Sequence, residues 1–395
     1  MSGDTGSAGR PWDVGTLPFV YAPLKAPTNG PDLPDLLPFA LDVDSQSGVL
    51  VQEPNEAVTC AVEKAYLRGS TFTGTMDSEG IGKQYAEDFL SFLEHHSGRT
   101  SFHDAKILEI GCGTGYLLHR LKLLGADVLG IEPGDHGQEG SKRYHIRIIR
   151  DFFPSAAIRG KFDLILAYGV LEHVQSSQDF LHHIAAHLND GGQIAISVPD
   201  CEPYIRSGDV SMLLHEHWNY YTGTTLRNFI AQNVNVGVQV QRSQFGGALY
   251  AATDKRHPVE TTERMGIDHR TDVLADYRLA VERAIGRLVS YFEDAARKRE
   301  SVGVFVPGRA INALAMMRRR IDPSSIRFFD DNRILHGTYF PGFDIRIESR
   351  EELISSPTDR ILVMSHAFGT RIAEELRSAT HNRSAFTTWE DIFAN

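Results

Sequence analysis

Short apolar runs alternate with helical patterns through the middle of the chain. The run at residues 107–110 is followed by leucines at helical spacing. Similar runs recur further along, at residues 128–131, 146–149, 162–167, 193–198, 236–240 and 248–252. Strands that alternate with helices predict a mostly parallel, doubly wound sheet. In such a sheet a ligand binds at the carboxyl ends of the strands. We therefore expect a ligand at the carboxyl ends of the first four strands.

The segments before this unit follow another pattern. Prolines are frequent in the first 40 residues, which favours extended and loop-like structure. Residues 41–44 and 49–52 have the alternation of a small hairpin. Two helices are predicted next, one from Asn55 onward and one over residues 79–95.

A long helix and a second α/β region follow. In residues 272–299 apolar side chains repeat at four-three-four spacing, which predicts a buried stripe between domains rather than a partner-binding coiled coil. Short strands recur after residue 301, the first leading into a turn with one glycine, Gly308. The expected fold class is α/β, with a Rossmann-like core, a small N-terminal module and a second Rossmann-like domain. The expected divisions are residues 1–100, 101–255, 256–300 (the linking helix) and 301–395.

Composition and charge exclude several classes of partner. The 395 residues allow about two or three domains, and the net charge of −11 offers no basic field for nucleic acid. No apolar run approaches the ~20 residues that span a bilayer. The polar start is expected to be disordered and lacks an apolar signal core, so a cytoplasmic location away from membranes is expected. Cys60, Cys112 and Cys201 form no C-x-x-C pair, which argues against a disulfide framework.

The turn after the first apolar run has almost no side chains. Gly111, Gly113 and Gly115 occupy alternate positions, so a ligand can approach the backbone. The next strand ends on Glu132, whose carboxylate is placed to accept hydrogen bonds from ribose hydroxyls. A dinucleotide fingerprint would need glycine where Tyr116 stands. A purely structural turn in another Rossmann-like protein is the alternative interpretation.

The spacing E-x-G-x-G-x-G resembles motif I of the class I S-adenosylmethionine-dependent methyltransferases. In that family the glycine loop lies against the methionine part of the cofactor, and the acid after the second strand holds its ribose. The resemblance implies S-adenosylmethionine as cofactor, bound by Glu109, Gly111, Gly113, Gly115 and Glu132. Three residues at the ends of the third and fourth strands are expected to line the same site, namely Asp151, Phe152 and Tyr168.

A cluster of titratable residues lies between the fifth strand and the next helix. Its sequence, His215-Glu216-His217, does not match the H-E-x-x-H zinc spacing, so no metal is expected. The cluster suits general acid–base chemistry, because imidazole titrates near neutrality and a neighbouring carboxylate can orient it and raise its pKa. His173, at the tip of the fourth strand, points toward the same edge of the sheet. An exposed polar loop with stacked aromatic residues is the alternative.

The order of parts resembles the sugar C-methyltransferases, which act on nucleotide-linked keto-deoxysugars. Those enzymes have an N-terminal zinc-binding domain, a class I methyltransferase core and a C-terminal Rossmann-like domain. The resemblance covers nearly the whole chain, and its more specific marks are H-E-H followed by Tyr220, Gly246-Gly247, and residues 330–342. It implies that four residues lie beside the substrate sugar, namely His173, His215, Glu216 and His217.

Several positions depart from the pattern of that family. Asp44 and Ser47 stand where zinc-binding cysteines are expected, so the N-terminal module is expected to hold no zinc. Leu214 replaces a tyrosine, Phe72 replaces an aromatic hydroxyl, and Phe245 replaces a histidine before the glycine pair. In the C-terminal domain the family's Y-G-A-x-x-K turn lacks its lysine. These changes weaken the substrate assignment more than the assignment to methyl transfer.

Together these features predict a methyltransferase that uses S-adenosylmethionine on a small molecule, most simply a nucleotide-linked keto-sugar. His217, assisted by Glu216, is expected to remove a proton next to a ketone, and the carbanion would attack the methyl group in line. O- or N-methylation of another natural-product or saccharide intermediate is the first alternative. A catalytically silent binding protein is the second, and the glycine loop with Glu132 argues against it. No oligomeric state is indicated.

Overall fold

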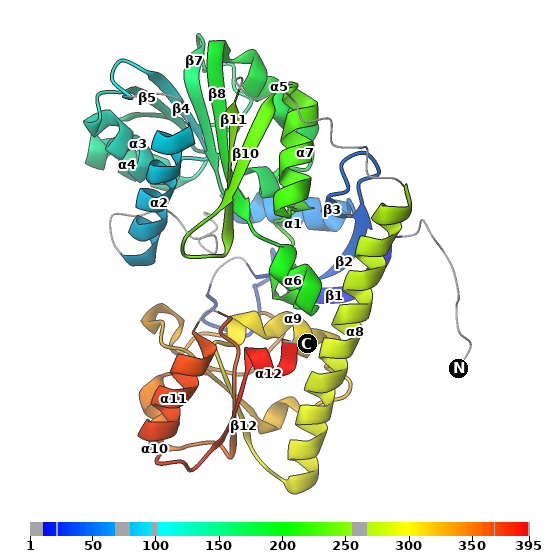
Figure 1. Cartoon of the computed structure of the whole chain (residues 1–395). Coiled ribbons are helices and arrows are strands. Elements are labelled where there is room, and N and C mark those ends of the chain that lie inside the picture. The colour runs from blue at the N-terminus through cyan, green and yellow to red at the C-terminus, as the bar shows by residue number, and fades with distance from the viewer. Residues whose placement is uncertain are drawn as a thin grey trace.

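The described part of the chain folds around three β-sheets, which Figure 1 shows together with the helices that cover them. The computed structural model describes residues 11–20, 23–67, 80–96, 101–254, 267–366 and 368–393. Phe72 lies outside these residues, as does the polar start at residues 1–10.

The largest sheet has seven strands in the order β10-β11-β8-β7-β4-β5-β6. Its parallel strands are β4 (Lys106–Ile110), β5 (Asp127–Ile131), β6 (Arg147–Ile149), β7 (Phe162–Tyr168) and β8 (Leu188–Pro199). The strand β11 (Ala248–Asp254) is antiparallel both to β8 and to β10 (Gly237–Arg242). β4 buries its apolar side chains on both faces, as a central parallel strand does. The mostly parallel sheet is therefore confirmed.

Helices cover both faces of this sheet, and each face has its own apolar core. On one face α2 (Gly80–His96) and α3 (Tyr116–Leu123) pack around Ile107, whereas on the other α5 (Ser177–Ala186) and α7 (Gly223–Val234) pack around Leu108. These two neighbours point to opposite faces because side chains alternate along a strand. α2 thus packs on the seven-stranded sheet, although the expected boundary at residue 100 places it in the N-terminal module. The short helix α4 (Asp135–Tyr144) follows β5.

The N-terminal residues form a four-stranded sheet. Its strands are β1 (Trp12–Pro18), β2 (Leu36–Val43), β3 (Leu50–Gln52) and β9 (Asn219–Tyr220), in that order, and α1 (Glu56–Leu67) follows β3. The expected hairpin is confirmed as the β2–β3 pair. Of the extended and loop-like structure expected over the first 40 residues, β1 and most of β2 are extended and pair as regular strands rather than loops. These strands form despite their prolines because the apolar face of the sheet is buried, including Leu17 and Phe39. At the hairpin turn Asp44 accepts hydrogen bonds from the backbone and hydroxyl of Ser47.

The remaining residues build a parallel five-stranded sheet beside a long helix. The strands β12 (Val302–Phe305), β13 (Ile326–Phe329), β14 (Ile347–Glu348), β15 (Arg360–Val363) and β16 (Ala385–Thr388) are arranged in the order β14-β13-β12-β15-β16. Its helices are α9 (Ile311–Met316), α10 (Arg350–Ser355), α11 (Gly369–Ala379) and α12 (Trp389–Phe393). α8 (Ile267–Lys298) runs along the side of the molecule, with α6 (Glu202–Ser207) against it (Figure 1).

One apolar core joins the N-terminal sheet, α8 and the five-stranded sheet. Phe39, Leu288 and Phe328 are all buried in it. The buried stripe expected on the long helix is therefore confirmed. α8 has 32 residues, but no helix in the described ranges is apolar enough over a sufficient length to cross a membrane.

Candidate functional site

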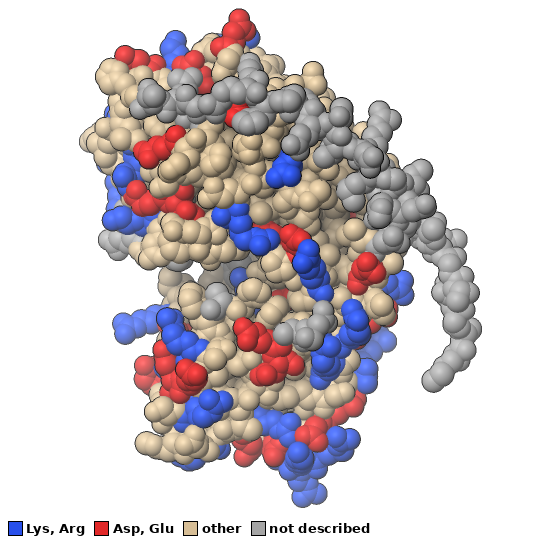
Figure 2. All heavy atoms as spheres, viewed as in Figure 1, with Lys and Arg blue, Asp and Glu red and all other residues tan. Residues whose placement is uncertain are grey.

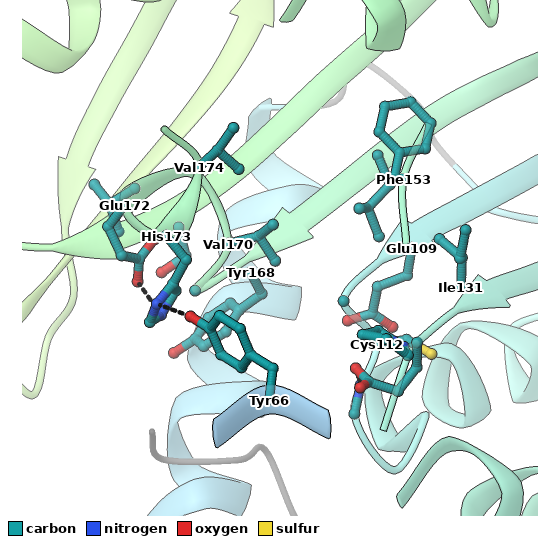
Figure 3. A pocket seen from close by; sticks show the side chains of 18 of the residues that line it. Tyr66, Glu109, Cys112, Ile131, Phe153, Tyr168, Val170, Glu172, His173 and Val174 are labelled. Carbon is teal, nitrogen blue, oxygen red and sulfur yellow. Dashed lines mark hydrogen bonds and ion pairs between the residues drawn. The ribbon is translucent and has the colours of Figure 1, made fainter. Parts of the chain in front are cut away.

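A cavity of about 630 Å³ opens at the carboxyl ends of the central parallel strands. Residues that directly follow β4, β5, β6 and β7 line it, and α1 and the segment before β9 also contribute. Its volume lies in the range of small-molecule sites, about 300–1,000 Å³. In Figure 3 Glu172, His173 and Tyr66 lie on one side of the cavity, and Glu109 and Cys112 lie on the other.

The loop between β4 and α3 is shaped by its glycines, as expected. Gly111, Gly113 and Gly115 have φ angles of 66°, 51° and 71°, in the left-handed region that strains other residues. At Gly111 a Cβ atom would lie only 2.5 Å from a methyl carbon of Val170. Gly111 and Gly113 line the cavity, whereas Gly115 caps α3 behind it. A bound molecule can therefore approach the peptide backbone closely.

Glu132 places its carboxylate at the tip of β5, facing this loop. One oxygen accepts a hydrogen bond from the backbone N–H of Gly113 at 3.0 Å, and the other accepts from that of Gly134 at 2.8 Å. Each carboxylate oxygen has a further acceptor site, and the side chain lines the cavity. The two backbone donors orient the carboxylate so that vicinal hydroxyl groups could donate to it.

Glu109 is buried at the foot of the glycine loop. Burial raises the pKa of its carboxyl group well above the usual range, the nearby charge of Glu132 adds to this, and a hydrogen bond from the backbone of Leu118 opposes it. Glu109 lines the cavity, as expected, and it also ties the end of β4 to the first turns of α3.

The three remaining expected cofactor residues also line the cavity. Asp151 accepts from the backbone of Phe152 at 2.8 Å and from the hydroxyl of Ser155 at 2.6 Å, which holds its carboxylate after β6. Phe152 is 52% exposed and can cover a ligand from outside. Tyr168 ends β7, and burial raises the pKa of its hydroxyl to about 12.

A second polar group lies across the cavity from the glycine loop. Glu172 and His173 belong to a 3₁₀ turn after β7, and His217 precedes β9. Glu172 Oε1 lies 3.8 Å from His173 Nε2, and the rings of His173 and His217 are 4.7 Å apart and nearly perpendicular. All three line the cavity. We refer to these three residues as the acceptor-side cluster.

Burial governs the ionisation of the acceptor-side cluster. It raises the pKa of Glu172 to about 8 and lowers that of His173 to about 4. The pKa of His217 falls well below the ordinary value because of burial and, secondarily, the neighbouring His173. The expectation that a carboxylate raises the pKa of this histidine is therefore wrong. Both imidazoles are neutral near pH 7 and carry free lone pairs.

His215 and Glu216, expected beside the substrate, do not line the cavity. The ring of His215 packs edge-on against Phe19 and Phe39, and its Nε2 atom lies 3.2 Å from the carbonyl oxygen of Leu37. These contacts turn His215 into the N-terminal sheet instead of the cavity.

Glu172 is the carboxyl group that shares the cavity with His217, and Glu216 does not line it, so the assistance expected from Glu216 stays a prediction. Glu216 contributes its backbone carbonyl, which accepts a hydrogen bond from Nδ1 of His173 at 3.0 Å. Side chains of adjacent residues in an irregular segment point in different directions. Three consecutive polar residues therefore do not all face the cavity.

Two tyrosines at the site were not predicted. The hydroxyl of Tyr66 lies 2.9 Å from Nδ1 of His173, and that of Tyr85 donates to the carbonyl of Gly246 at 3.0 Å. Both line the cavity. Tyr85 lies within the helix predicted over residues 79–95, and Tyr66 lies in the one predicted from Asn55 onward, so neither carried a sign of function.

The comparisons with known proteins agree with this geometry. Residues 81–235 match the family described as "Methyltransferase domain". The seven-stranded sheet and its helices have the class I methyltransferase fold, so the chain carries a methyltransferase domain that uses S-adenosylmethionine. The matched range begins in α2, in agreement with the packing of that helix on the sheet.

Individual relatives are similar over part of the chain. Ubiquinone biosynthesis O-methyltransferase from Bradyrhizobium sp. (strain ORS 278) is 35% identical over 102 residues, covering 23% of this chain and 39% of that protein. tRNA U34 carboxymethyltransferase from Pseudoalteromonas translucida is 30% identical over 152 residues, covering 35% of this chain and 42% of that protein. The chain thus spans about two fifths of the curated relatives it matches. Magnesium protoporphyrin IX methyltransferase from Synechocystis PCC 6803 has 15% identity and a TM-score of 0.34, covering 45% of this chain and 86% of that structure.

Proposed function

We propose that the protein transfers a methyl group from S-adenosylmethionine to carbon in a small acceptor, a nucleotide-linked keto-sugar. One observation carries the proposal: a single cavity joins the glycine loop and Glu132 to the acceptor-side cluster. A cofactor held by the first group would direct its reactive end toward the second. Much of the acceleration would come from this positioning.

Methylation on carbon requires a group that removes a proton next to the ketone. We assign this role to His217, with Glu172 in place of Glu216 as the acidic residue beside it. The proton would pass from carbon to the imidazole, and the electron pair left on carbon would form the new bond. When bound, the cofactor supplies the methyl group and its sulfur takes the electrons of the broken bond. Tyr66, through His173, holds the cluster in place.

A nucleotide-linked acceptor is supported by a cation between the cavity and the five-stranded sheet. Arg309 follows β12 and donates to the hydroxyl of Tyr204 at 3.0 Å. The pKa of the cavity residue Tyr85 is raised by burial, and the charge of Arg309 opposes this rise. The surface is hollowed between the parts built on the two large sheets (Figure 2). Guanidinium groups bind phosphate oxygens well, so a diphosphate could extend from the cavity to this point.

O- or N-methylation of another natural-product or saccharide intermediate is the second candidate. It is favoured by the names of similar proteins, since several of these are called ubiquinone biosynthesis O-methyltransferases. The same cluster could accept a proton from a hydroxyl group. Figure 2 shows acidic and basic side chains interspersed on the face in view, which suits a small acceptor better than nucleic acid.

The decisive experiment identifies the acceptor. The protein is incubated with S-adenosylmethionine and, in turn, with keto-sugar nucleotides and hydroxylated small molecules, and products that gain one CH₂ are sought by mass spectrometry. Product should form with the wild type and be greatly reduced with Glu132→Ala. Absence of any methylated product, while the demethylated cofactor still binds, would count against a transferase role.

Hydrogen exchange separates the two candidates. In heavy water, with the demethylated cofactor bound, a C-methylating enzyme should introduce deuterium next to the ketone of its verified acceptor, and His217→Ala should not. An O- or N-methylating enzyme has no reason to exchange that hydrogen. Methylation of an acceptor at oxygen without carbon-bound exchange would replace the first candidate by the second.

A further inference from the structure

The acceptor-side cluster has the composition of a metal site. Glu172, His173 and His217 each offer one ligand atom, and these three atoms lie within 4.8 Å of one another. Ligands of one tetrahedral ion, each about 2.0–2.1 Å from it, are roughly 3.3 Å apart. The 3.8 Å between Glu172 Oε1 and His173 Nε2 is near this value. Side-chain shifts of about 1 Å would therefore suffice for ligation.

The side chains of this cluster have unused donor atoms. Glu172 is 3% exposed and His217 is 7% exposed. Within the described part of the chain, neither Oε2 of Glu172 nor Nε2 of His217 has a hydrogen-bond partner. No Lys or Arg of the described residues forms an ion pair with Glu172 either. Buried polar atoms without partners are costly, and a cation would satisfy both.

The surroundings of His173 orient it as a metal ligand. Its Nδ1 atom lies 3.0 Å from the backbone carbonyl oxygen of Glu216, and a carbonyl can only accept a hydrogen bond. The tautomer that suits this contact has the proton on Nδ1, where the hydroxyl oxygen of Tyr66 at 2.9 Å can also accept it, and its Nε2 presents a lone pair toward Glu172. Metal-binding histidines commonly donate their other ring N–H to a carbonyl in this way.

We propose that Glu172, His173 and His217 bind a divalent transition-metal ion of the zinc class, with one coordination position open to the cavity. Two imidazole nitrogens and one carboxylate oxygen are a donor set typical of catalytic zinc sites. The H-E-H sequence shows no zinc spacing because only its third residue, His217, belongs to the proposed site. Folding brings the other two ligands from the turn after β7 instead.

The role of the ion rests on the proposed function, whereas its binding does not. An ion with an open position would hold the oxygen of the acceptor's keto or hydroxyl group. In the ion-bound protein His217 would be a ligand, so the base role assigned to it above applies to the ion-free protein, and in the ion-bound protein the proton would leave to water in the cavity. Either candidate reaction could use such an ion.

Zinc titration of the chelator-treated protein, residues 1–395, tests the proposal. Calorimetry should find one Zn²⁺ per chain, and Co²⁺ should give the visible absorption of a four-coordinate site. His217→Ala and the near-isosteric Glu172→Gln should each weaken Zn²⁺ binding by about 100-fold or more. The reason is that the loss of a residue that only supports a metal ligand already lowers metal affinity by about 10–100-fold. His182→Ala and His183→Ala, which alter exposed histidines of α5, should leave the affinity unchanged.

Folding and cofactor binding are measured separately for each variant. Thermal unfolding and titration with the demethylated cofactor report on the fold and on the Glu132 side of the cavity, which the metal does not involve. If Zn²⁺ binds at one per chain and no methylated product is found, the proposed function fails and the metal site stands. The metal proposal is overturned if the wild type binds no Zn²⁺, if folded His217→Ala and Glu172→Gln retain full affinity, or if Mg²⁺ binds in preference.

Discussion

At the scale of single residues, the orientation of a side chain depends on the backbone groups that hold it. Glu132 is held by two backbone N–H groups, one from the glycine loop and one from the turn after β5. His215 is held by aromatic rings and a carbonyl of the N-terminal sheet, so it is turned away from the cavity. These contacts decide which polar residues can meet a ligand.

Replacing Glu132 by alanine should weaken cofactor binding. The variant loses charge-assisted hydrogen bonds to the ribose, each worth about 1.5–3 kcal/mol, so a loss of about 1–3 kcal/mol in binding free energy is expected. Calorimetry with S-adenosylhomocysteine measures it. Asp127→Ala, which removes an exposed acid at the other end of β5, is the matched control and should bind normally. Equal affinities of both variants would contradict the assignment of Glu132.

Replacing His217 by alanine should separate catalysis from cofactor binding. His217 and Glu132 line the cavity from different segments, before β9 and after β5, so cofactor affinity should change little. Turnover should fall by about 10²–10⁴, whether the imidazole acts as a base or as a ligand. His183→Ala, on the exposed face of α5, serves as the control. Parallel loss of cofactor affinity and turnover would mean that His217 is structural.

Replacing Tyr66 by phenylalanine should test the support of the cluster. The change removes the hydroxyl that lies 2.9 Å from Nδ1 of His173 but keeps the ring. Turnover should fall by about 10-fold or more while cofactor affinity is retained, since the loss of an orienting contact typically costs 10–100-fold. Steady-state kinetics with the identified acceptor measures it. Unchanged kinetics would show that His173 is positioned without Tyr66.

At the scale of elements, α8 matters because its buried face is shared by two sheets. Leu288 is 1% exposed in the core that joins the N-terminal and five-stranded sheets, whereas Leu279 on the same helix is 51% exposed. The apolar stripe was evident in the sequence. The partners that cover it were not, because they come from both ends of the chain.

Replacing Leu288 by alanine should destabilise the protein by about 2–5 kcal/mol, the usual cost of a cavity in a packed core. Leu279→Ala, the same substitution on the exposed side of the helix, should change the free energy of unfolding by less than about 0.5 kcal/mol. Urea unfolding of both variants makes the comparison. Similar losses for the two would mean that α8 is not packed as described.

At the scale of the whole molecule, the C-terminal helix is tied to the segment that leads to the site. Trp389 of α12 donates a hydrogen bond from its indole nitrogen to the carboxylate of Asp209 at 2.6 Å, in a buried environment. Asp209 also accepts from the backbone of Ser211. Residues 209–211 precede the H-E-H segment, so the C-terminal domain helps to hold that segment.

Replacing Trp389 by phenylalanine should cost about 1–3 kcal/mol of stability, because it keeps an aromatic ring but leaves a buried carboxylate with one donor fewer. In an Asp209→Asn background the same change should cost less, because the charge that needs the donor is gone. Unfolding free energies of the four variants form a double-mutant cycle. Strict additivity would mean that the two side chains do not interact energetically.

The elements of the central sheet, its glycine loop and Glu132 could be predicted because each depends on residues near in sequence. Strand β4, the three glycines and β5 lie within 26 positions, from Lys106 to Ile131. Apolar periodicity is sufficient to identify such a unit, and the glycine spacing is sufficient to indicate a backbone that a ligand approaches. The strands β1 and β2 were missed because prolines dominate their local signal while burial of the finished sheet stabilises them.

The catalytic side of the cavity was decided by tertiary structure. Glu172 and His173 lie more than 40 positions before His217, and Tyr66 is 107 positions from His173. Local sequence suggested that His215, Glu216 and His217 act together, yet packing against the N-terminal sheet separates them. Burial then lowers the basicity of the histidines and leaves Glu172 without a counter-charge among the described residues. Ionisation follows from which segments exclude water from a group, and that depends on the assembled fold.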